Sequence, residues 1–323
     1  MIFDLPRLLG PDAKRSPDME AVWTWMSAED KDVPNWLTLP PAEARQLHNG
    51  LTRRWNSELP SVESAEPLVV PGEPDVPCQL IVPHEAEPGC ILFLHGGGWA
   101  FGDLQTHQRF MRLLAIACRR RLLAVDYRLA PEHPYPAPFE DSRAAWQWLV
   151  ATGAEDERFA GPLAVAGDSA GANLALALSL DAVDRNARRP DAALLFYGAY
   201  EGGAETPSYD RFATGFGLTG AAMRRFWDYY VPDRTKRSDP LVSPTKASDA
   251  QLRSLPPLFL NAAGLDPLLC DTLDLVSRLE KLQVPHRFEL HDGVHHGFMQ
   301  MSLRLPEAQR AIDFAASFLR DVG

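Results

Sequence analysis

Residues 163–173 read Leu-Ala-Val-Ala-Gly-Asp-Ser-Ala-Gly-Ala-Asn, and a run rich in alanine and leucine follows them. A short apolar stretch typical of a buried strand thus leads through Gly167-Asp168-Ser169-Ala170-Gly171 into a stretch typical of a helix. The glycines permit a turn that is too tight for a side chain on either side of the serine. A strand–turn–helix with this pattern holds its serine hydroxyl exposed at the edge of a sheet, so the sequence predicts that Ser169 is a nucleophile.

A second glycine-rich turn lies upstream, where His95-Gly96-Gly97-Gly98 follows the apolar run 90–94. Three consecutive glycines after a strand leave backbone N–H groups free to bind a developing oxyanion. Removal of one such donor costs an enzyme about a hundred- to a thousandfold in rate. Taken alone, the stretch is more typical of a flexible turn. The serine pattern downstream changes this interpretation and favours an oxyanion hole.

Short apolar runs alternate with helical runs through most of the chain. Most apolar runs lack polar alternation, as strands covered on both faces do. The predicted strands are 79–82, 91–94, 122–125, 163–166, 193–197, 258–262 and 287–290, and the predicted helices are 110–119, 142–150, 173–183, 271–281 and 307–319. This order predicts an α/β fold whose mostly parallel sheet carries helices on both faces and gathers functional residues at the carboxyl ends of its strands.

Other parts of the chain depart from that alternation. Residues 1–58 combine tryptophans, charges and proline breaks, and predict two or three short amphipathic helices in front of a main domain over residues 59–323. The interval 198–257 is long for a connection between two strands, and such insertions usually cover a functional site. With the N-terminal helices, the insertion at about 200–250 predicts a helical cap.

Prolines between positions 60 and 77 predict strands that lie only at a sheet edge.

Bulky rings near the two glycine-rich turns are candidates for a substrate pocket. They are Trp99 and Phe101 after the oxyanion glycines, Tyr197 at the end of a predicted strand, and Phe212 and Phe216 in the insertion. Rings of this size would close a pocket around a short acyl group. For the rings of the insertion, the alternative is that they form a small core of their own.

A serine hydroxyl needs a base to remove its proton. In a sheet of this type the acid and then the histidine follow the serine along the chain. His286 and His291 lie at the two ends of the last predicted strand, and His295 and His296 lie in a glycine-flanked loop beyond it. A base belongs in that loop, but spacing does not choose between His295 and His296.

The acid is expected just past a strand as well. Asp266 follows the predicted strand 258–262 and is favoured by its position. Asp271 begins the next helix, where an N-cap role is expected, and Asp274 lies within that helix. A buried aspartate at position 266 would fix the tautomer of the histidine and stabilise the imidazolium that forms during attack.

Composition narrows the classes of partner. The chain has 323 residues, 46% of them hydrophobic, and a formal net charge of −11, which argues against nucleic acid or an anionic membrane as a main partner. Its four cysteines are far apart, and Cys90 and Cys118 adjoin apolar runs, so buried free thiols are expected. The sequence shows no signal peptide, membrane span or His-Glu-x-x-His motif, and we expect a cytoplasmic protein without metal or cofactor.

Five motifs in order resemble the hormone-sensitive lipase family of α/β-hydrolases, and within it the bacterial acetyl esterases. They are His95-Gly96-Gly97-Gly98-Trp99, Asp126-Tyr127-Arg128-Leu129-Ala130-Pro131-Glu132, Gly167-Asp168-Ser169-Ala170-Gly171, Asp266-Pro267-Leu268 and His296-Gly297-Phe298. The resemblance covers nearly the whole chain. It implies an α/β-hydrolase fold with an eight-stranded, mostly parallel sheet, helices on both faces and a helical cap.

The resemblance also implies roles for single residues. His296 would be the base because it directly precedes Gly-Phe, and Asp266 the acid because it precedes Pro-Leu. The N–H groups of Gly97, Gly98 and Ala170 would bind the oxyanion, and residues 127–132 would brace the site from behind. The chain departs from many relatives at His295, where they carry an apolar residue. Relatives often pair through their last strand, here near 287–290, which implies a homodimer.

The function implied is that of a serine carboxylesterase. It would hydrolyse short-chain, acetyl-type esters of small molecules through an acyl-enzyme. An amidase or deacetylase acting on an N-acyl metabolite is the alternative within the same chemistry, because one triad serves both bonds. A non-catalytic receptor or regulatory partner is the alternative of another class, and the presence of all three triad residues argues against it.

Overall fold

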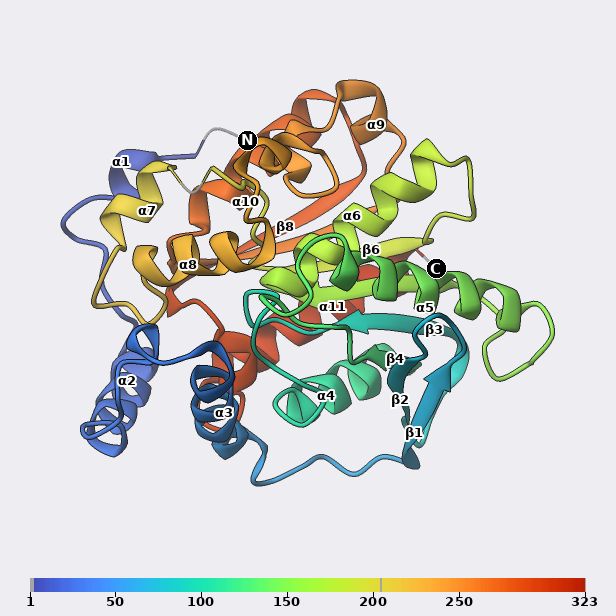
Figure 1. Cartoon of the computed structure of the whole chain (residues 1–323), viewed down its shortest axis with the longest axis horizontal. Coiled ribbons are helices and arrows are strands. Elements are labelled where there is room, and N and C mark those ends of the chain that lie inside the picture. Colours follow the sequence, from blue (N-terminus) through green and yellow to red (C-terminus); the bar gives the residue numbers. More distant parts are fainter. Residues whose placement is uncertain (1–2, 204, 323) are drawn as a thin grey trace.

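The described residues of a computed structural model, 3–203 and 205–322, form one sheet of eight strands (Figure 1). Their order is β1-β2-β4-β3-β5-β6-β7-β8; β2 is antiparallel to β1 and β4, and the other neighbours are parallel. The expected eight-stranded, mostly parallel sheet is therefore confirmed. The strands are β1 (Ser64–Val70), β2 (Val76–Val82), β3 (Glu87–Leu94), β4 (Arg120–Val125), β5 (Leu163–Asp168), β6 (Ala192–Phe196), β7 (Leu258–Leu265) and β8 (His286–His295).

Helices cover both faces of this sheet. In β3, Leu92 and Leu94 join one cluster of buried side chains with α5, α6 and α10, whereas Ile91 and Phe93 join a second cluster with α4 and α11. Because both faces are buried, the central strands read as continuous apolar runs. The helices are α1 (Leu5–Leu8), α2 (Pro17–Glu29), α3 (Pro41–Thr52), α4 (Gln108–Cys118), α5 (Ala137–Gly153), α6 (Ala170–Asp184), α7 (Pro207–Arg211), α8 (Gly220–Tyr230), α9 (Asp249–Arg253), α10 (Leu269–Lys281) and α11 (Pro306–Val322), with 3-10 turns η1 (Trp36–Thr38), η2 (Arg53–Asn56), η3 (Arg234–Ser238), η4 (Pro244–Lys246) and η5 (Phe298–Met301).

The chain reverses its direction across the sheet between β3 and β5. From β3 it passes through α4 to β4, then returns across β3 through α5 to β5 and continues outward to β8. In open α/β sheets such a reversal leaves a crevice outside the carboxyl ends of the two strands. In this chain those two ends carry the glycines at 96–98 and Ser169.

The N-terminal helices and the insertion between β6 and β7 meet at one end of the molecule, where Figure 1 shows α1, α2 and α3 beside α7 and α8. Arg211 in α7 donates from Nε to the Leu9 carbonyl oxygen at 3.0 Å and from Nη2 to that of Gly10 at 3.1 Å. Trp36 of η1 stacks on Phe226 of α8, with ring centroids 5.1 Å apart. The two regions are thus in direct contact, although their action as a cap stays a prediction.

Several elements begin or end away from their predicted bounds for local reasons. α5 begins at Ala137 rather than at residue 142, because the first turn of a helix tolerates Pro138, whose missing N–H has no partner there. β7 and β8 run on to Leu265 and His295, because a shift of register after Ala263 lets their pairing continue. β8 lies at an edge of the sheet, and its pairing with a second copy stays a prediction.

The expectation that prolines confine strands to a sheet edge is right for β1 and wrong for β2. β1 contains Pro67 and lies at the edge. β2 contains Pro77 but lies between β1 and β4. Its ladder to β4 begins with Cys78 opposite Val125, so the N–H that Pro77 lacks falls just outside the ladder.

The four cysteines are buried free thiols, as expected. Burial raises the pKa of Cys78, Cys90 and Cys118 to about 12. A thiol reacts as its thiolate, so these side chains are inert packing groups in the folded protein.

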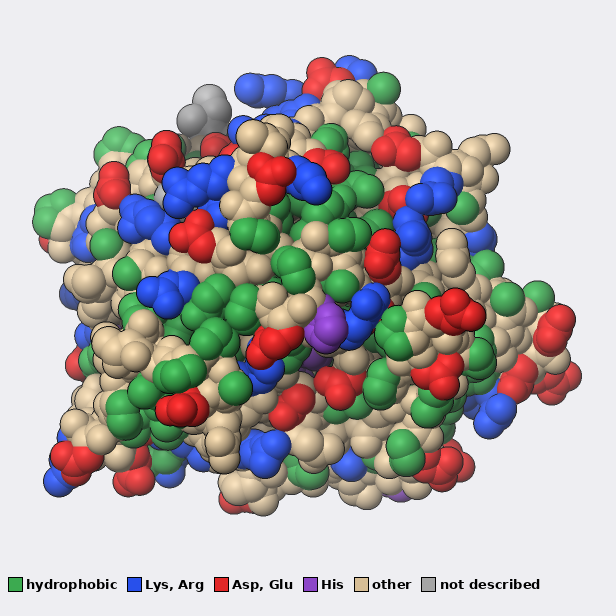
Figure 2. Space-filling view, viewed as in Figure 1, with side chains coloured by type: hydrophobic (Ala, Val, Ile, Leu, Met, Phe, Trp, Pro, Cys, Tyr) green, Lys and Arg blue, Asp and Glu red, His purple; other side chains and the backbone are tan. Residues whose placement is uncertain are grey.

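The surface mixes charges of both signs. On the face shown in Figure 2, acidic and basic side chains are interspersed, with apolar side chains between them. This face therefore presents no field of a single sign that would attract a polyanion. Across residues 3–203 and 205–322, no helix has the length and apolar character needed to cross a membrane.

The substitution Gly171→Ala tests how closely α6 approaches β3. A Cβ at this position would overlap the carbonyl oxygen of Leu94, a backbone atom that cannot move without moving the strand. We expect the free energy of unfolding to fall by about 3 kcal/mol or more, as measured by chemical denaturation.

Gly50→Ala is the matched control. Gly50 lies within α3, and a Cβ there would have no neighbour within 4 Å. Alanine is favoured over glycine inside a helix by up to about 1 kcal/mol, so this variant should be at least as stable as the parent. Equal stability of the two variants would contradict the close approach.

Candidate active site

Ser169 lies in the turn between β5 and α6. Its backbone has φ 55° and ψ −118°, a conformation that residues other than glycine rarely adopt. Its N–H donates to the carbonyl oxygen of Phe196 at 2.8 Å, which ties the turn to β6. Gly167 and Gly171 on either side have no room for a Cβ. The strained turn is therefore held by its neighbours on both sides, and the serine side chain stands at the carboxyl edge of the sheet.

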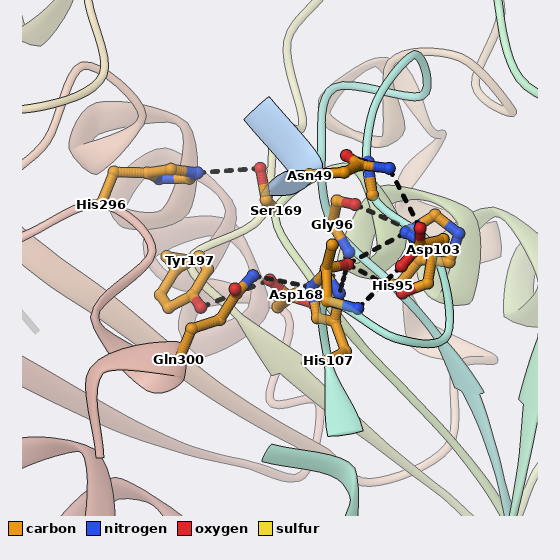
Figure 3. A network of polar contacts seen from close by, with 12 residues as sticks. Asn49, His95, Gly96, Asp103, His107, Asp168, Ser169, Tyr197, His296 and Gln300 are labelled. Atoms are coloured by element: carbon orange, nitrogen blue, oxygen red, sulfur yellow. Dashed lines mark hydrogen bonds and ion pairs between the residues drawn. The ribbon is translucent and has the colours of Figure 1, made fainter. Parts of the chain in front are cut away.

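His296 and Asp266 complete a chain of hydrogen bonds that begins at Ser169. Ser169 Oγ lies 2.8 Å from His296 Nε2, and His296 Nδ1 lies 2.7 Å from Asp266 Oδ2 (Figure 3 shows the first of these contacts). His296 directly follows β8, and Asp266 directly follows β7. Asp266 is 1% exposed, and its other carboxylate oxygen accepts the Leu268 N–H at 2.8 Å. The three side chains come from the ends of three strands and meet at one edge.

This arrangement can move a proton away from the serine. The Asp266 carboxylate has no hydrogen to donate, so the hydrogen of the 2.7 Å contact is assigned to His296 Nδ1. Nε2 then presents a lone pair to the hydroxyl of Ser169. Within the described residues, no group of three or more His, Cys, Asp or Glu side chains is placed to hold a metal ion.

Three backbone N–H groups lie in the two turns that follow β3 and β5. Gly97 and Gly98 have φ of 118° and 60°, and within the described part of the chain neither N–H has a hydrogen-bond partner. Ala170 is the first residue of α6, so its N–H has no carbonyl one helical turn earlier to bind. Free N–H groups at the start of a helix favour a negative charge, which suits a developing oxyanion.

A buried polar network lies beneath Ser169 (Figure 3). Asp168 accepts the Gly96 N–H at 2.9 Å and the Tyr197 hydroxyl at 3.3 Å, and its Oδ1 lies 3.3 Å from His107 Nε2. Burial alone would raise the pKa of Asp168, but His107 and the Gly96 N–H outweigh it and lower the pKa below its usual value. The ionised carboxylate therefore links two turns. One holds the glycines at 96–98 and is called the oxyanion turn, and the other holds Ser169 and is called the serine turn.

Further contacts hold this network in place. Thr106 Oγ1 lies 2.9 Å from His107 Nδ1, and Gln300 Nε2 lies 2.8 Å from His107 Nε2. The Tyr127 hydroxyl donates to the carbonyl oxygen of His95 at 2.6 Å. Asp168 and His107 were not among the predicted site residues. The position of Asp168 beside the serine was the one signal in the sequence that could have indicated the network.

Aromatic rings pack beside Gly98, one of the glycines of the predicted oxyanion hole. A Cβ on Gly98 would overlap the ring of Phe226 from α8. Phe226 packs against Phe101 with ring centroids 5.2 Å apart and stacks on Trp36. The N-terminal region, the oxyanion turn and the insertion thus meet beside Gly98. Of these rings only Phe101 was predicted to line the pocket, because spacing along the chain does not show that Trp36 and Phe226 lie together.

Two other predicted pocket residues pack close to the site. The ring of Tyr197 lies 4.9 Å from the ring of His296, measured between centroids. Burial, and then the charge of Asp168, raise the pKa of Tyr197 well above its usual value, so its hydroxyl stays a donor. Trp99 is fully buried and stacks on Tyr230 of α8 at 4.3 Å, which anchors the oxyanion turn to the insertion.

The structure separates the two histidines that spacing left open. His296 Nε2 faces Ser169, whereas His295 Nε2 lies 2.8 Å from Arg15 Nε. The predicted pocket residue Phe216 contacts His295, with centroids 5.9 Å apart. Phe212 lies 5.2 Å from Phe216 and is fully buried in a cluster with residues of α1, β7 and α10.

The expected N-cap role of Asp271 is wrong. The residue before α10 is Leu268, and Asp271 lies within the first turn of that helix. Its Oδ2 accepts the N–H groups of Tyr200 and Glu201, both at 3.1 Å. The Asp271 carboxyl group therefore binds the backbone at the start of the insertion, a distant partner that local sequence rules do not show.

Known proteins share this architecture. Residues 91–300 match a family model described as alpha/beta hydrolase fold. An alpha/beta hydrolase enzyme from the metagenome of Lake Arreo, Spain, is 30% identical with a TM-score of 0.89, covering 95% of this chain and 98% of that one. A thermostable esterase from Pseudomonas putida is 28% identical (TM-score 0.87, 97% and 98% covered). An esterase from Pyrobaculum calidifontis is 26% identical (TM-score 0.87, 95% and 98% covered). The chain therefore belongs to the α/β-hydrolase family, in its branch that resembles hormone-sensitive lipase, and is a carboxylic ester hydrolase.

Proposed function

We propose that this hydrolase cleaves short-chain, acetyl-type esters of small molecules through an acyl-enzyme formed on Ser169. The observation that carries the proposal is the unbroken hydrogen-bond chain from Ser169 through His296 to Asp266, beside the free N–H groups of Gly97 and Gly98. The chain supplies an activated nucleophile, and the N–H groups supply a site for the charge that its attack creates.

In the first half of the reaction Ser169 Oγ attacks the ester carbonyl carbon. His296 Nε2 takes the hydroxyl proton, and Asp266 stabilises the imidazolium through Nδ1–H. The carbonyl oxygen becomes an oxyanion, which accepts hydrogen bonds from the N–H groups of Gly97, Gly98 and Ala170. When the tetrahedral intermediate collapses, His296 gives its proton to the departing alcohol, and the acyl group stays on Ser169.

In the second half a water molecule takes the place of the alcohol. His296 Nε2 removes a proton from the water as it attacks the acyl carbon, and the same N–H groups bind the second oxyanion. Collapse returns the proton to Ser169 Oγ and releases the carboxylic acid. One base and one oxyanion site thus serve both halves.

The preference for short acyl chains is supported by the packing around Gly98. Phe226 leaves no room for even a Cβ on this glycine, and Phe101 and Trp36 pack against the same ring. Each methylene added to a substrate gains about 0.8 kcal/mol of apolar burial while space remains. Once the space is filled, overpacking costs roughly 1–3 kcal/mol. These opposing contributions favour a short chain.

Ser169→Ala tests the nucleophile. The substitution removes one oxygen and should abolish both ester hydrolysis and labelling by a fluorophosphonate, while the protein stays folded. A phosphonate is a suitable class of probe, since one similar structure is described as an ester-hydrolase complexed with a derivative of bipyridine phosphonate. Labelling that persists in the variant would show that another residue is the nucleophile.

His296→Ala and Asp266→Asn test the rest of the triad. Loss of the base should lower kcat by several orders of magnitude, and the asparagine should lower it about ten-thousandfold because it favours the wrong tautomer. His295→Ala should cost much less than His296→Ala. Asp274→Asn, a change on the exposed carboxyl of α10, is the control and should keep the parental kcat. A larger loss in His295→Ala than in His296→Ala would overturn the assignment of the base.

A series of p-nitrophenyl esters from acetate to dodecanoate tests the acyl preference. We expect kcat/KM to peak between acetate and about hexanoate and to fall with longer chains, for the reasons of packing given above. The longer esters, which form micelles, are measured below and above the concentration at which micelles appear, and no jump in rate is expected at the lipid interface. A maximum at ten carbons or more, or activation by micelles, would refute the preference.

A further inference from the structure

Arg15 connects the N-terminal region with the loop that carries His296. It lies just before α2, and its Nε donates to Nε2 of His295 at 2.8 Å. The same guanidinium donates to the carbonyl oxygen of Gly215 in the insertion and, at 3.2 Å, to the carboxylate of Glu20. The Arg15 side chain is 17% exposed. One mostly buried cation therefore joins the N-terminal region, the insertion and the histidine loop.

His295 is built to accept this hydrogen bond. It is 1% exposed, and its ring meets Trp23 edge-on, with centroids 5.0 Å apart. Burial, and then the charge of Arg15, lower the pKa of His295 to about 3, so the ring is neutral near neutral pH. A guanidinium only donates, so His295 must present the lone pair of Nε2 to it. An apolar residue at position 295 could not accept the hydrogen bond that Arg15 Nε donates.

Ring contacts and backbone contacts strengthen the same junction. The Arg15 guanidinium lies 4.5 Å from the ring centroid of Trp23 and 5.5 Å from that of Phe216, within cation–π range. The Ser16 N–H donates to the carbonyl oxygen of Gly293 at 2.9 Å, and a Cβ on Gly293 would collide with Ser16. Two consecutive N-terminal residues thus hold positions 293 and 295, directly before the base.

The loop that carries His296 is held on both sides, and Arg15 contributes to the side before it. The residue before His296, His295, pairs with Leu265 of β7, and Arg15 fixes its side chain. After His296, the carbonyl oxygen of Gly297 accepts the Gln300 N–H at 3.2 Å. His296 Nε2 must stay within hydrogen-bond distance of Ser169 Oγ, and a displacement of about 1 Å in such a group can cost a hundredfold in rate.

We propose that Arg15 is a positioning residue, which acts through His295 to keep His296 aligned with Ser169. The inference rests on the proposed function, in which His296 is the base. Arg15 touches neither the triad side chains nor the N–H groups of the oxyanion turn in the described contacts, so it acts through the loop. Because substrate binding does not need this alignment but proton transfer does, its loss should lower kcat more than it changes KM.

A double-mutant cycle with Arg15→Ala and His295→Leu tests the coupling, with kcat and KM measured on p-nitrophenyl acetate. We expect each single variant to lose about ten- to a hundredfold in kcat with little change in KM, and the double variant to lose no more than the worse single one. His295→Gln keeps an acceptor for Arg15 and should restore most of kcat. Losses that multiply in the double variant would show independent effects and overturn the proposal.

Arg211→Ala is the matched control. Arg211 also ties the N-terminal region to the insertion, through the Leu9 and Gly10 carbonyl oxygens, but does not contact the histidine loop. It should leave kcat near the parental value. If Arg15→Ala and Arg211→Ala change kcat and KM alike, Arg15 only anchors the N-terminal region, and the proposal fails. Thermal unfolding of every variant is measured alongside the kinetics. If Arg15→Ala does not fold, the kcat of His295→Leu and His295→Gln tests the positioning role in its place.

The triad variants separate this inference from the proposed function. If Ser169→Ala or His296→Ala keeps parental activity, the proposed function is wrong and no role for Arg15 in it remains. If both abolish activity while Arg15→Ala and His295→Leu keep the full kcat, the function stands and the positioning role alone is wrong.

Discussion

Gly171 lies so close to the end of β3 that a Cβ on it would overlap the carbonyl oxygen of Leu94. The first turn of α6 and the last residue of β3 are therefore in backbone contact. This contact brings the turn that holds Ser169, which directly precedes α6, to the end of β3, and the turn that follows β3 contains Gly97 and Gly98. The proposed nucleophile and the N–H groups proposed to bind the oxyanion lie at one crevice because two parallel strands are neighbours at the reversal of the sheet and no side chain keeps their ends apart.

Asp168 holds the same junction by charge. A buried carboxylate costs free energy unless its oxygens are hydrogen-bonded and its charge is balanced, and here the Gly96 N–H, the Tyr197 hydroxyl and His107 surround it. A negative charge beneath the serine would also oppose the oxyanion that forms above. The partners of Asp168 offset that repulsion and at the same time fix the start of the oxyanion turn.

Local patterns in the sequence were enough for the central strands, for Ser169 and for the position of Asp266, because strand ends, glycine turns and helix runs each follow from a few neighbouring residues. The eighth strand and the choice of His296 over His295 came from the resemblance to known motifs, since spacing alone left the two histidines open. Contacts between distant segments were not predictable in that way. Trp36 and Phe226 are separate aromatic residues in the sequence, and only the folded chain stacks one on the other. Asp271 was predicted to be a helix cap from its place at the start of a helix. Its partners at positions 200 and 201 lie on another segment, which the neighbouring residues in the sequence do not reveal. The edge position predicted for the strand with Pro77 was wrong for another reason. The ladder between β2 and β4 begins one residue later, at Cys78, so it does not need the N–H that Pro77 lacks.

The contact between Arg15 and His295 spans 280 positions in the sequence. A ribosome makes the chain from its N-terminus, so all eight strands of the described sheet are synthesised by the time His295, the last residue of β8 and the partner of Arg15, is added. Contacts of such separation form late and slowly, because a long loop must close before the contact gains anything. Growing chains thus carry Ser169 and the glycines at 96–98 well before the loop with His296 is made. The proposed triad is therefore complete only once the last strand and the loop after it are in place.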